Sequence, residues 1–182
     1  MDSDTALVFG GLGLDGTLND VWEYRVVGKN WTRLHEGDFG TTTVAMVASA
    51  NAASISPSAR VGHSACVMSE DLYIFGGYSV ESGNMNDIWV FNREAGTWSE
   101  IELDSASPVP APRSGSSIVA PDPTGTVFIL FGGDGKDDVW NFDVKTAVWT
   151  MLQGESVAVT SGGGRSVGLA TVLTAVFLIF NI

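Results

Sequence analysis

The hydrophobic positions of the chain fall into short runs that end in paired glycines. Three such runs, at 7–11, 72–77 and 128–133, consist of β-branched, aromatic and leucine residues before the glycines. After each run, apolar and polar positions alternate, as over 21–26. Runs of this composition and a period of two both predict β-strands. Adjacent glycines permit positive φ, so we expect the first of these strands to turn sharply there.

A longer motif recurs three times around these strands. Each glycine pair precedes an Asp-x-Trp-x-aromatic cluster, and a second tryptophan follows the first after nine residues in every copy. A constant spacing is typical of a tight hairpin, because a shift of one residue would move a tryptophan to the opposite face of the sheet. The motif therefore predicts a repeated antiparallel unit. It accounts for all 6 tryptophans: Trp22 and Trp31, Trp89 and Trp98, Trp140 and Trp149.

One more strand is expected before the glycine pair in the second and third copies, over 59–68 and 112–119. Each range carries an arginine near its start, Arg60 or Arg113, which we expect to bond carbonyl groups between neighbouring units. An aspartate also recurs at one repeat position. We expect this series to accept backbone hydrogen bonds rather than to catalyse a reaction: Asp20, Asp87 and Asp138.

Together these features resemble the kelch repeat, a unit of roughly fifty residues that forms one blade of a β-propeller. The resemblance rests on the glycine pair, the aromatic residue of the cluster, and a tryptophan seven residues after that aromatic. It implies an all-β fold of four-stranded antiparallel blades around a channel. The repeat residues are Gly10, Gly11, Trp22, Tyr24, Trp31, Gly76, Gly77, Trp89, Phe91, Trp98, Gly132, Gly133, Trp140, Phe142 and Trp149.

The resemblance divides the chain into three recognisable repeats with connecting segments. The expected repeats are 6–34 (lacking its first strand), 57–103 and 104–152; the others are a long link at 35–56, a Gly/Ser linker at 153–165 and an apolar tail at 166–182. A closed propeller needs about four to eight blades. We therefore expect an incomplete ring that belongs to a larger propeller.

The tail allows two interpretations, because its sixteen residues from 167 to 182 carry no charge. As a helix they would span about 24 Å, less than the roughly 30 Å of a bilayer core. As strands they would continue the array, since Arg60, Arg113 and Arg165 are 53 and 52 residues apart. We favour a partial fourth repeat and keep a membrane segment as the alternative.

Composition narrows the range of functions. The chain has 182 residues and a net charge of −12, and a nucleic-acid partner is not expected because phosphate binding needs a positive field. The single cysteine, Cys66, excludes an internal disulfide and is expected to be a buried, inert thiol. The two histidines, His35 and His63, form no visible metal or nucleophile set, and His63 is expected to have a packing role. We expect no catalytic activity, no cofactor and no metal.

Variable loops suggest a binding surface. The turns after the glycine pairs and the links between repeats lie on one face of the blades, and variable loops on a rigid scaffold commonly bind partners. We expect a cytoplasmic interaction module or scaffold for another protein. The alternatives are a membrane-attached kelch protein held by 166–182, and part of a kelch-type enzyme with catalytic residues in other blades. The candidate binding residues are Asp15, Thr17, Tyr78, Glu81, Asn84, Asp134 and Lys136.

Overall fold

A computed structural model describes residues 4–37, 55–104 and 107–154 of the chain. Within these ranges the secondary structure consists of eleven strands and no helix. The strands are β1 (Thr5–Leu12), β2 (Thr17–Arg25), β3 (Asn30–His35), β4 (Ser64–Met68), β5 (Asp71–Ser79), β6 (Gly83–Asn92), β7 (Thr97–Glu100), β8 (Ser117–Val119), β9 (Val127–Gly133), β10 (Lys136–Asp143) and β11 (Val148–Gln153).

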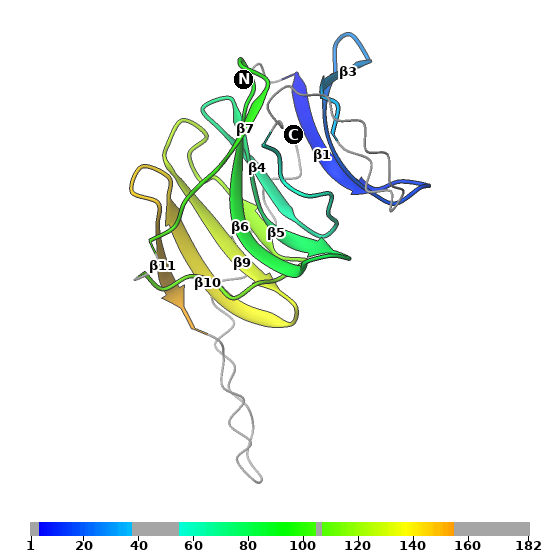
Figure 1. Cartoon of the computed structure of the whole chain (residues 1–182). Coiled ribbons are helices and arrows are strands. Elements are labelled where there is room, and N and C mark those ends of the chain that lie inside the picture. The colour runs from blue at the N-terminus through cyan, green and yellow to red at the C-terminus, as the bar shows by residue number, and fades with distance from the viewer. Residues whose placement is uncertain (1–3, 38–54, 105–106, 155–182) are drawn as a thin grey trace, which may run out of the picture.

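The strands form three antiparallel sheets, which we call blade 1 (β1–β3), blade 2 (β4–β7) and blade 3 (β8–β11). Neighbouring strands in each sheet are consecutive in sequence, so each blade is a simple meander. Figure 1 shows the blades fanned side by side in chain order. The all-β expectation is confirmed, with four strands in blades 2 and 3, three in the described part of blade 1, and no closed ring among these residues.

The glycine pairs have the expected positive φ. In blade 2, Gly76 and Gly77 have φ of 59° and 99°, and the pairing of β5 with β6 shifts register between Phe75 and Gly77. The strand does not turn there, however, because β5 continues to Ser79. The pair therefore forms a β-bulge inside the strand, which bends the strand and leaves the turn a few residues further on.

The first strands of blades 2 and 3 are shorter than the sequence suggested. We expected strands over 59–68 and 112–119, whereas β4 begins at Ser64 and β8 at Ser117. Gly62 and Gly115 have φ of 64° and 68°, outside the β region, which interrupts the extended chain. The residues before each glycine cross from one blade to the next.

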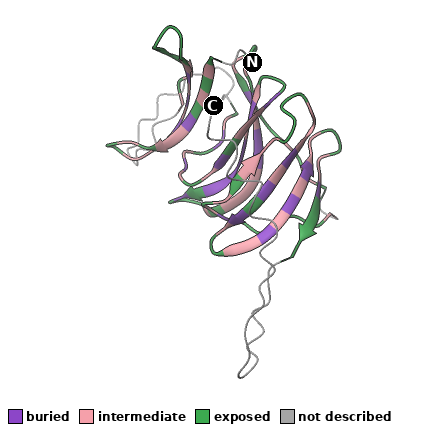
Figure 2. Ribbon diagram, turned by 180° about the vertical axis from the view of Figure 1, so that it is seen from behind, coloured by how far each residue is buried: buried purple, intermediate pink, exposed green. Residues whose placement is uncertain are grey.

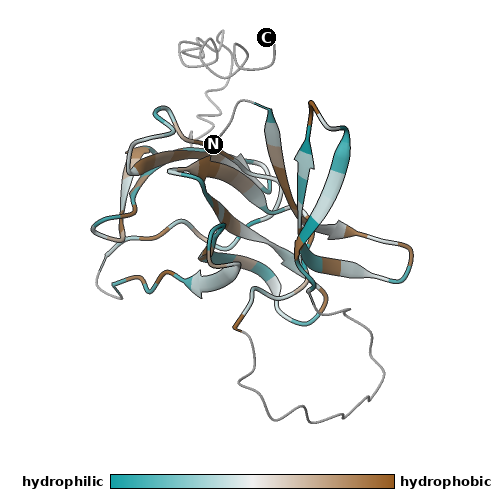
Figure 3. Ribbon diagram, turned by 90° about the horizontal axis from the view of Figure 1, so that it is seen from above, coloured by the Kyte–Doolittle hydropathy of each residue, from teal (hydrophilic) through white to brown (hydrophobic). Residues whose placement is uncertain are grey.

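Each pair of neighbouring blades encloses an apolar core. One face of each blade contributes a phenylalanine and an aliphatic residue, and the facing side of the next blade contributes its tryptophans. In Figure 3, hydrophobic residues, coloured brown, lie along the strands. The core between blades 1 and 2 contains Phe9, Val21, Leu72, Ile74, Trp89, Phe91 and Trp98, and that between blades 2 and 3 contains Met68, Phe75, Ile88, Phe128, Leu130, Trp140, Phe142 and Trp149.

His63 lies against the first of these cores. Its ring makes an edge contact with Phe9 of blade 1, with 5.0 Å between ring centroids. Burial, aided by the charge of Arg60, lowers the pKa of His63 to about 4, and a hydrogen bond with the Phe9 backbone opposes the shift. His63 is therefore neutral at pH 7 and packs against Phe9, as expected.

The bulge glycines give a first test. Alanine at Gly76 would place its Cβ 2.8 Å from the carbonyl oxygens of Arg113 and Met85, whereas alanine at Gly83, which also has positive φ, would meet nothing within 4 Å. Both variants strain the backbone by about 1–2 kcal/mol. We expect Gly76→Ala to lower the free energy of unfolding by about 1–3 kcal/mol more than Gly83→Ala. Urea unfolding measures both, and equal losses would contradict the close approach.

His63 gives a pH test. Because its pKa is about 4 in the folded protein and about 6.5 when unfolded, the unfolded state binds a proton first as the pH falls. Its contribution to stability is thus complete above pH 6.5 and is lost between there and about pH 4, by at most about 3 kcal/mol. Urea unfolding across this range should show a shallower decline for His63→Leu than for the unchanged protein. Parallel declines would show that His63 does not titrate this way.

Candidate functional site

The candidate site is the loop face, the end of the blades that carries the β1–β2, β5–β6 and β9–β10 turns and the links between blades. Antiparallel order places these connections at one end and the β2–β3, β6–β7 and β10–β11 turns at the other. The turns of the loop face occupy 13–16, 80–82 and 134–135.

Two of the candidate residues meet between blades 2 and 3. The Asn84 side-chain amide donates a hydrogen bond to Asp134 Oδ2 at 2.6 Å. Asp134 also accepts hydrogen bonds from the Ser114 hydroxyl at 3.1 Å and the Ser114 backbone N–H at 3.2 Å. These polar groups therefore join the two blades and the link between them.

The structure does not gather the other candidates into one cluster. Asp15 and Glu81 are exposed in the β1–β2 and β5–β6 turns, while Thr17 and Lys136 are half-buried at the starts of β2 and β10. The main chain of Tyr78 pairs with the link that precedes β4, through hydrogen bonds of 2.8 and 3.0 Å. Its side chain is 43% exposed.

Sequence reasoning placed the turns after the glycine pairs on the loop face but did not single out their exposed aliphatic side chains. Leu12, Leu14 and Val80 are 77%, 105% and 83% exposed, and Tyr78 adds an exposed aromatic ring. Composition alone does not show whether such an aliphatic side chain folds back onto the core or stays in solvent. The signal that could have identified them is the pair Gly13 and Gly16, which closes a tight turn through a 2.8 Å backbone hydrogen bond and leaves Leu14 at its tip.

The links beneath the loop face join successive blades through their main chain. Arg60 N donates to Leu18 O of blade 1 at 3.2 Å, and Gly11 N donates to Arg60 O at 3.3 Å. Arg113 repeats the arrangement on blade 2, where Arg113 N donates to Met85 O and Gly77 N donates to Arg113 O, each at 2.9 Å.

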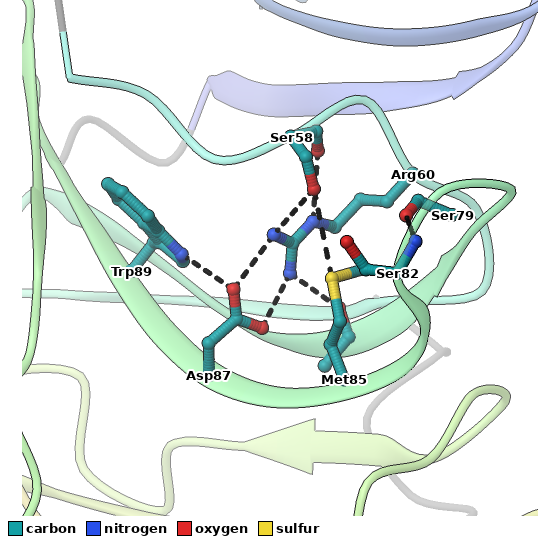
Figure 4. Close-up of polar contacts among 8 residues, drawn as sticks. Ser58, Arg60, Ser79, Ser82, Met85, Asp87 and Trp89 are labelled. Atoms are coloured by element: carbon teal, nitrogen blue, oxygen red, sulfur yellow. Dashed lines mark hydrogen bonds and ion pairs between the residues drawn. The ribbon is translucent and has the colours of Figure 1, made fainter.

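The arginine side chain then reaches into the following blade, as Figure 4 shows for Arg60. Its Nη1 donates to Gly76 O at 2.9 Å and to Asp87 Oδ1 at 2.7 Å, and its Nη2 donates to Asp87 Oδ2 at 2.8 Å. The indole of Trp89 donates to the same carboxylate at 2.8 Å. We call this set of link arginine, aspartate and tryptophan the arginine clamp.

The clamp recurs in blade 3 with Arg113, Asp138 and Trp140. Arg113 Nη2 lies 2.8 Å from Asp138 Oδ2, and the Trp140 indole donates to that oxygen at 2.7 Å. Burial acts to raise the pKa of Asp138, but the hydrogen bonds from Arg113 and Trp140 and the charge of Arg113 outweigh it, so the pKa lies below the usual range.

The clamp is a structural device. The side chains of Arg60 and Arg113 are each 1% exposed, so their guanidinium groups are inaccessible to a partner. The expected carbonyl acceptors are present at Gly76 and Gly132. The aspartates differ from expectation, because the donors to Asp87 and Asp138 are indole and guanidinium groups rather than backbone N–H groups.

Within the described ranges, no three His, Cys, Asp or Glu side chains lie close enough to hold a metal ion. Burial raises the pKa of the Cys66 thiol to about 12, which keeps it protonated and unreactive. No helix in this part of the chain is long and apolar enough to span a membrane. The 166–182 tail lies outside the described residues.

Comparison with known proteins identifies the family to which the chain is similar. The family model of the KLHDC2/KLHL20/DRC7 Kelch-repeats domain matches residues 33–180. The tRNA wybutosine-synthesizing protein 2/3/4 of Oryza sativa subsp. japonica is 31% identical over 147 residues, which are 80% of this chain and 13% of that protein. Acyl-CoA-binding domain-containing protein 4 of Arabidopsis thaliana is 30% identical over 134 residues, 66% of this chain and 20% of that protein.

Kelch domain-containing protein 3 of Homo sapiens is 38% identical over 78 residues, 42% of this chain and 19% of that protein. The chain thus spans between 13% and 20% of the length of these relatives. The family model covers most of the chain, including the two blades whose aspartates bind the clamp arginines. The protein therefore belongs to the kelch-repeat family of β-propeller proteins.

Proposed function

We propose that the protein is a non-catalytic interaction module that binds another protein through its loop face. The observation that carries the proposal is the exposure of Leu12, Leu14 and Val80 at the ends of ordered strands. Large apolar side chains held away from any core on a rigid scaffold are typical of a protein-binding surface.

Charge indicates the chemistry of the partner. Asp15 and Glu81 are exposed beside the apolar tips, and the whole chain has a net charge of −12. A complementary surface would have an apolar centre and basic residues around it. Such a partner would also be attracted by the overall field of the chain.

The names of the relatives do not point to one shared reaction, which is consistent with a binding role for the segment they share. Their names refer to wybutosine synthesis, to acyl-CoA binding and to the kelch domain alone, while the shared segment covers at most 20% of those three proteins. One fold serves many functions, so the names of whole relatives do not assign a reaction to this segment.

The loop face can be tested by Leu14→Ser together with Val80→Ser. Because both side chains are exposed, stability should change by less than about 0.5 kcal/mol. Partner binding should weaken at least about tenfold. Affinity capture with quantitative mass spectrometry, followed by titration of the purified partner, measures the loss.

The matched control is Val27→Ser, since Val27 is 79% exposed in the β2–β3 turn at the opposite end of blade 1. It should retain the partner at the level of the unchanged chain. Equal retention by the loop-face variant and the control would overturn the proposed binding face.

We also propose that residues 166–182 continue the repeat array rather than cross a membrane. Two observations support this: the kelch family match runs to residue 180, and Arg165 follows Arg113 after 52 residues, close to the 53 between Arg60 and Arg113. An apolar segment placed in a blade would be covered by the neighbouring blade, as the strands of blade 2 are.

Fluorescent fusions test the tail. The full chain and a form ending at residue 165 should show the same distribution in cells, and neither should remain in the membrane pellet after alkaline carbonate extraction. A full chain that stays with the membranes, while the shortened form does not, would establish the membrane alternative.

A further inference from the structure

Asp134 carries a negative charge that the fold orients but does not neutralise. Its Oδ2 accepts hydrogen bonds from the Asn84 side-chain amide at 2.6 Å and from Ser114 N at 3.2 Å, and its Oδ1 accepts one from the Ser114 hydroxyl at 3.1 Å. These donors are all uncharged, and no cationic side chain of the described residues forms an ion pair with Asp134. The carboxylate is therefore held in one orientation while its charge stays available to a cation.

The groups around Asp134 lie at the junction of blades 2 and 3. Asn84 belongs to β6 of blade 2, Asp134 to the β9–β10 turn of blade 3, and Ser114 to the link that joins these blades. In Figure 2, exposed residues, coloured green, lie at turns, and buried residues, coloured purple, lie along the strands. The contacts that orient the carboxylate thus run between two blades that are both described.

Asp134 occupies a repeat position with a fixed main chain and a variable side chain. It follows the glycine pair of its blade, as Tyr78 and Leu12 follow theirs. Asp134 N donates to Ser114 O at 3.1 Å and Tyr78 N donates to Val61 O at 2.8 Å, so the preceding link holds this position in both blades. Its side chain is aliphatic in blade 1, aromatic in blade 2 and acidic in blade 3. Variable side chains on a rigid scaffold are typical of a recognition surface.

The Tyr78 ring lies on the same side of blade 2 as Asn84. These residues are directly opposite each other in the pairing of β5 with β6, which places their Cβ atoms about 5 Å apart. Tyr78 is 43% exposed, and no aromatic ring of the described residues packs against it. An exposed ring therefore neighbours the amide that bonds the Asp134 carboxylate.

An arginine side chain matches these groups in shape and charge. Its guanidinium group is planar, stacks on aromatic rings and carries several N–H donors, whereas a lysine ammonium is a compact point charge. Two acceptors are available to it. Asp134 Oδ1 accepts one hydrogen bond and has room for a second, and the Asn84 carbonyl oxygen accepts none from the described residues.

We propose that Tyr78, Asn84 and Asp134 form a guanidinium-binding site that receives an arginine side chain of the protein partner. The arginine donates hydrogen bonds to Asp134 and Asn84, and its plane stacks on the Tyr78 ring. Ser114 acts indirectly, because it holds the carboxylate in place. This inference rests on the proposed binding of a protein by the loop face, and it specifies one residue of that protein.

Titration of the full 182-residue chain with N-acetyl-arginine amide, followed by NMR, tests the site. The side-chain amide signals of Asn84 should shift with a saturable dissociation constant of roughly 1–10 mM. N-acetyl-citrulline amide has a similar shape without the charge and should bind at least about tenfold more weakly, and N-acetyl-lysine amide should also bind more weakly. Binding of either analogue as tight as that of the arginine amide, or no saturation by about 50 mM, would overturn the proposal.

Matched variants separate arginine binding from a structural role. Asp134→Asn keeps an acceptor and removes the charge, so arginine binding should fall at least about tenfold while the urea midpoint stays nearly unchanged. Tyr78→Leu keeps an apolar side chain and should weaken binding about threefold through lost stacking. The control is Asp15→Asn, which removes one exposed charge elsewhere on the loop face and should bind like the unchanged chain. Equal losses for the two aspartate variants would reduce the effect to overall charge and overturn the site.

Partner capture keeps this inference distinct from the proposed function. Asp134→Asn should lower the affinity for the captured partner at least about tenfold. A partner that Asp134→Asn retains in full, but that is lost on Leu14→Ser with Val80→Ser, would overturn the arginine site and leave the binding face standing. A partner that all these variants retain would overturn the binding face itself. If Asp134→Asn fails to fold, Tyr78→Leu and the citrulline comparison still decide the outcome.

Discussion

The arginine clamp is the interaction on which the array depends. The main chain of the clamp arginine is bonded to one blade, and its guanidinium group is bonded to the next blade. One residue therefore fixes the position of both blades. A buried charge without a partner costs much free energy of desolvation. A buried ion pair is tolerated only when further hydrogen bonds satisfy the remaining polar groups of both ions. Arg113 meets this condition through Asp138 and the carbonyls of Ala111 and Gly132. A shift of the blades by one residue would leave a charge without these partners.

The other repeat residues support this junction. Gly76 allows the carbonyl of Arg113 to approach, since a side chain there would lie 2.8 Å from that oxygen. Trp140 orients the Asp138 carboxylate while its ring packs in the core between blades. Glycine, aspartate and tryptophan thus recur together because they meet at one point, where a polar network borders an apolar core.

The sequence predicted the repeats and most strands, because tryptophan spacing and alternation are local signals. It did not predict the clamp geometry, because Arg60 and Asp87 lie 27 residues apart. The β-bulge between them shifts the strand register, and the sequence does not show by how much. It also overestimated the first strands, since the positive φ of Gly62 and Gly115 cannot be read from composition. Leu14 was placed in a turn but not singled out as a binding residue, because the sequence does not show that its side chain stays out of the core.

The clamp and the loop face lie close together yet are chemically separate. Arg60 is 1% exposed below the turns, whereas Leu14 and Val80 project from the turns into solvent. Loop residues can therefore change without disturbing a buried charge, while the clamp holds the strand ends that carry them. A scaffold built this way lets the turn residues vary and keeps stability dependent on contacts between neighbouring blades.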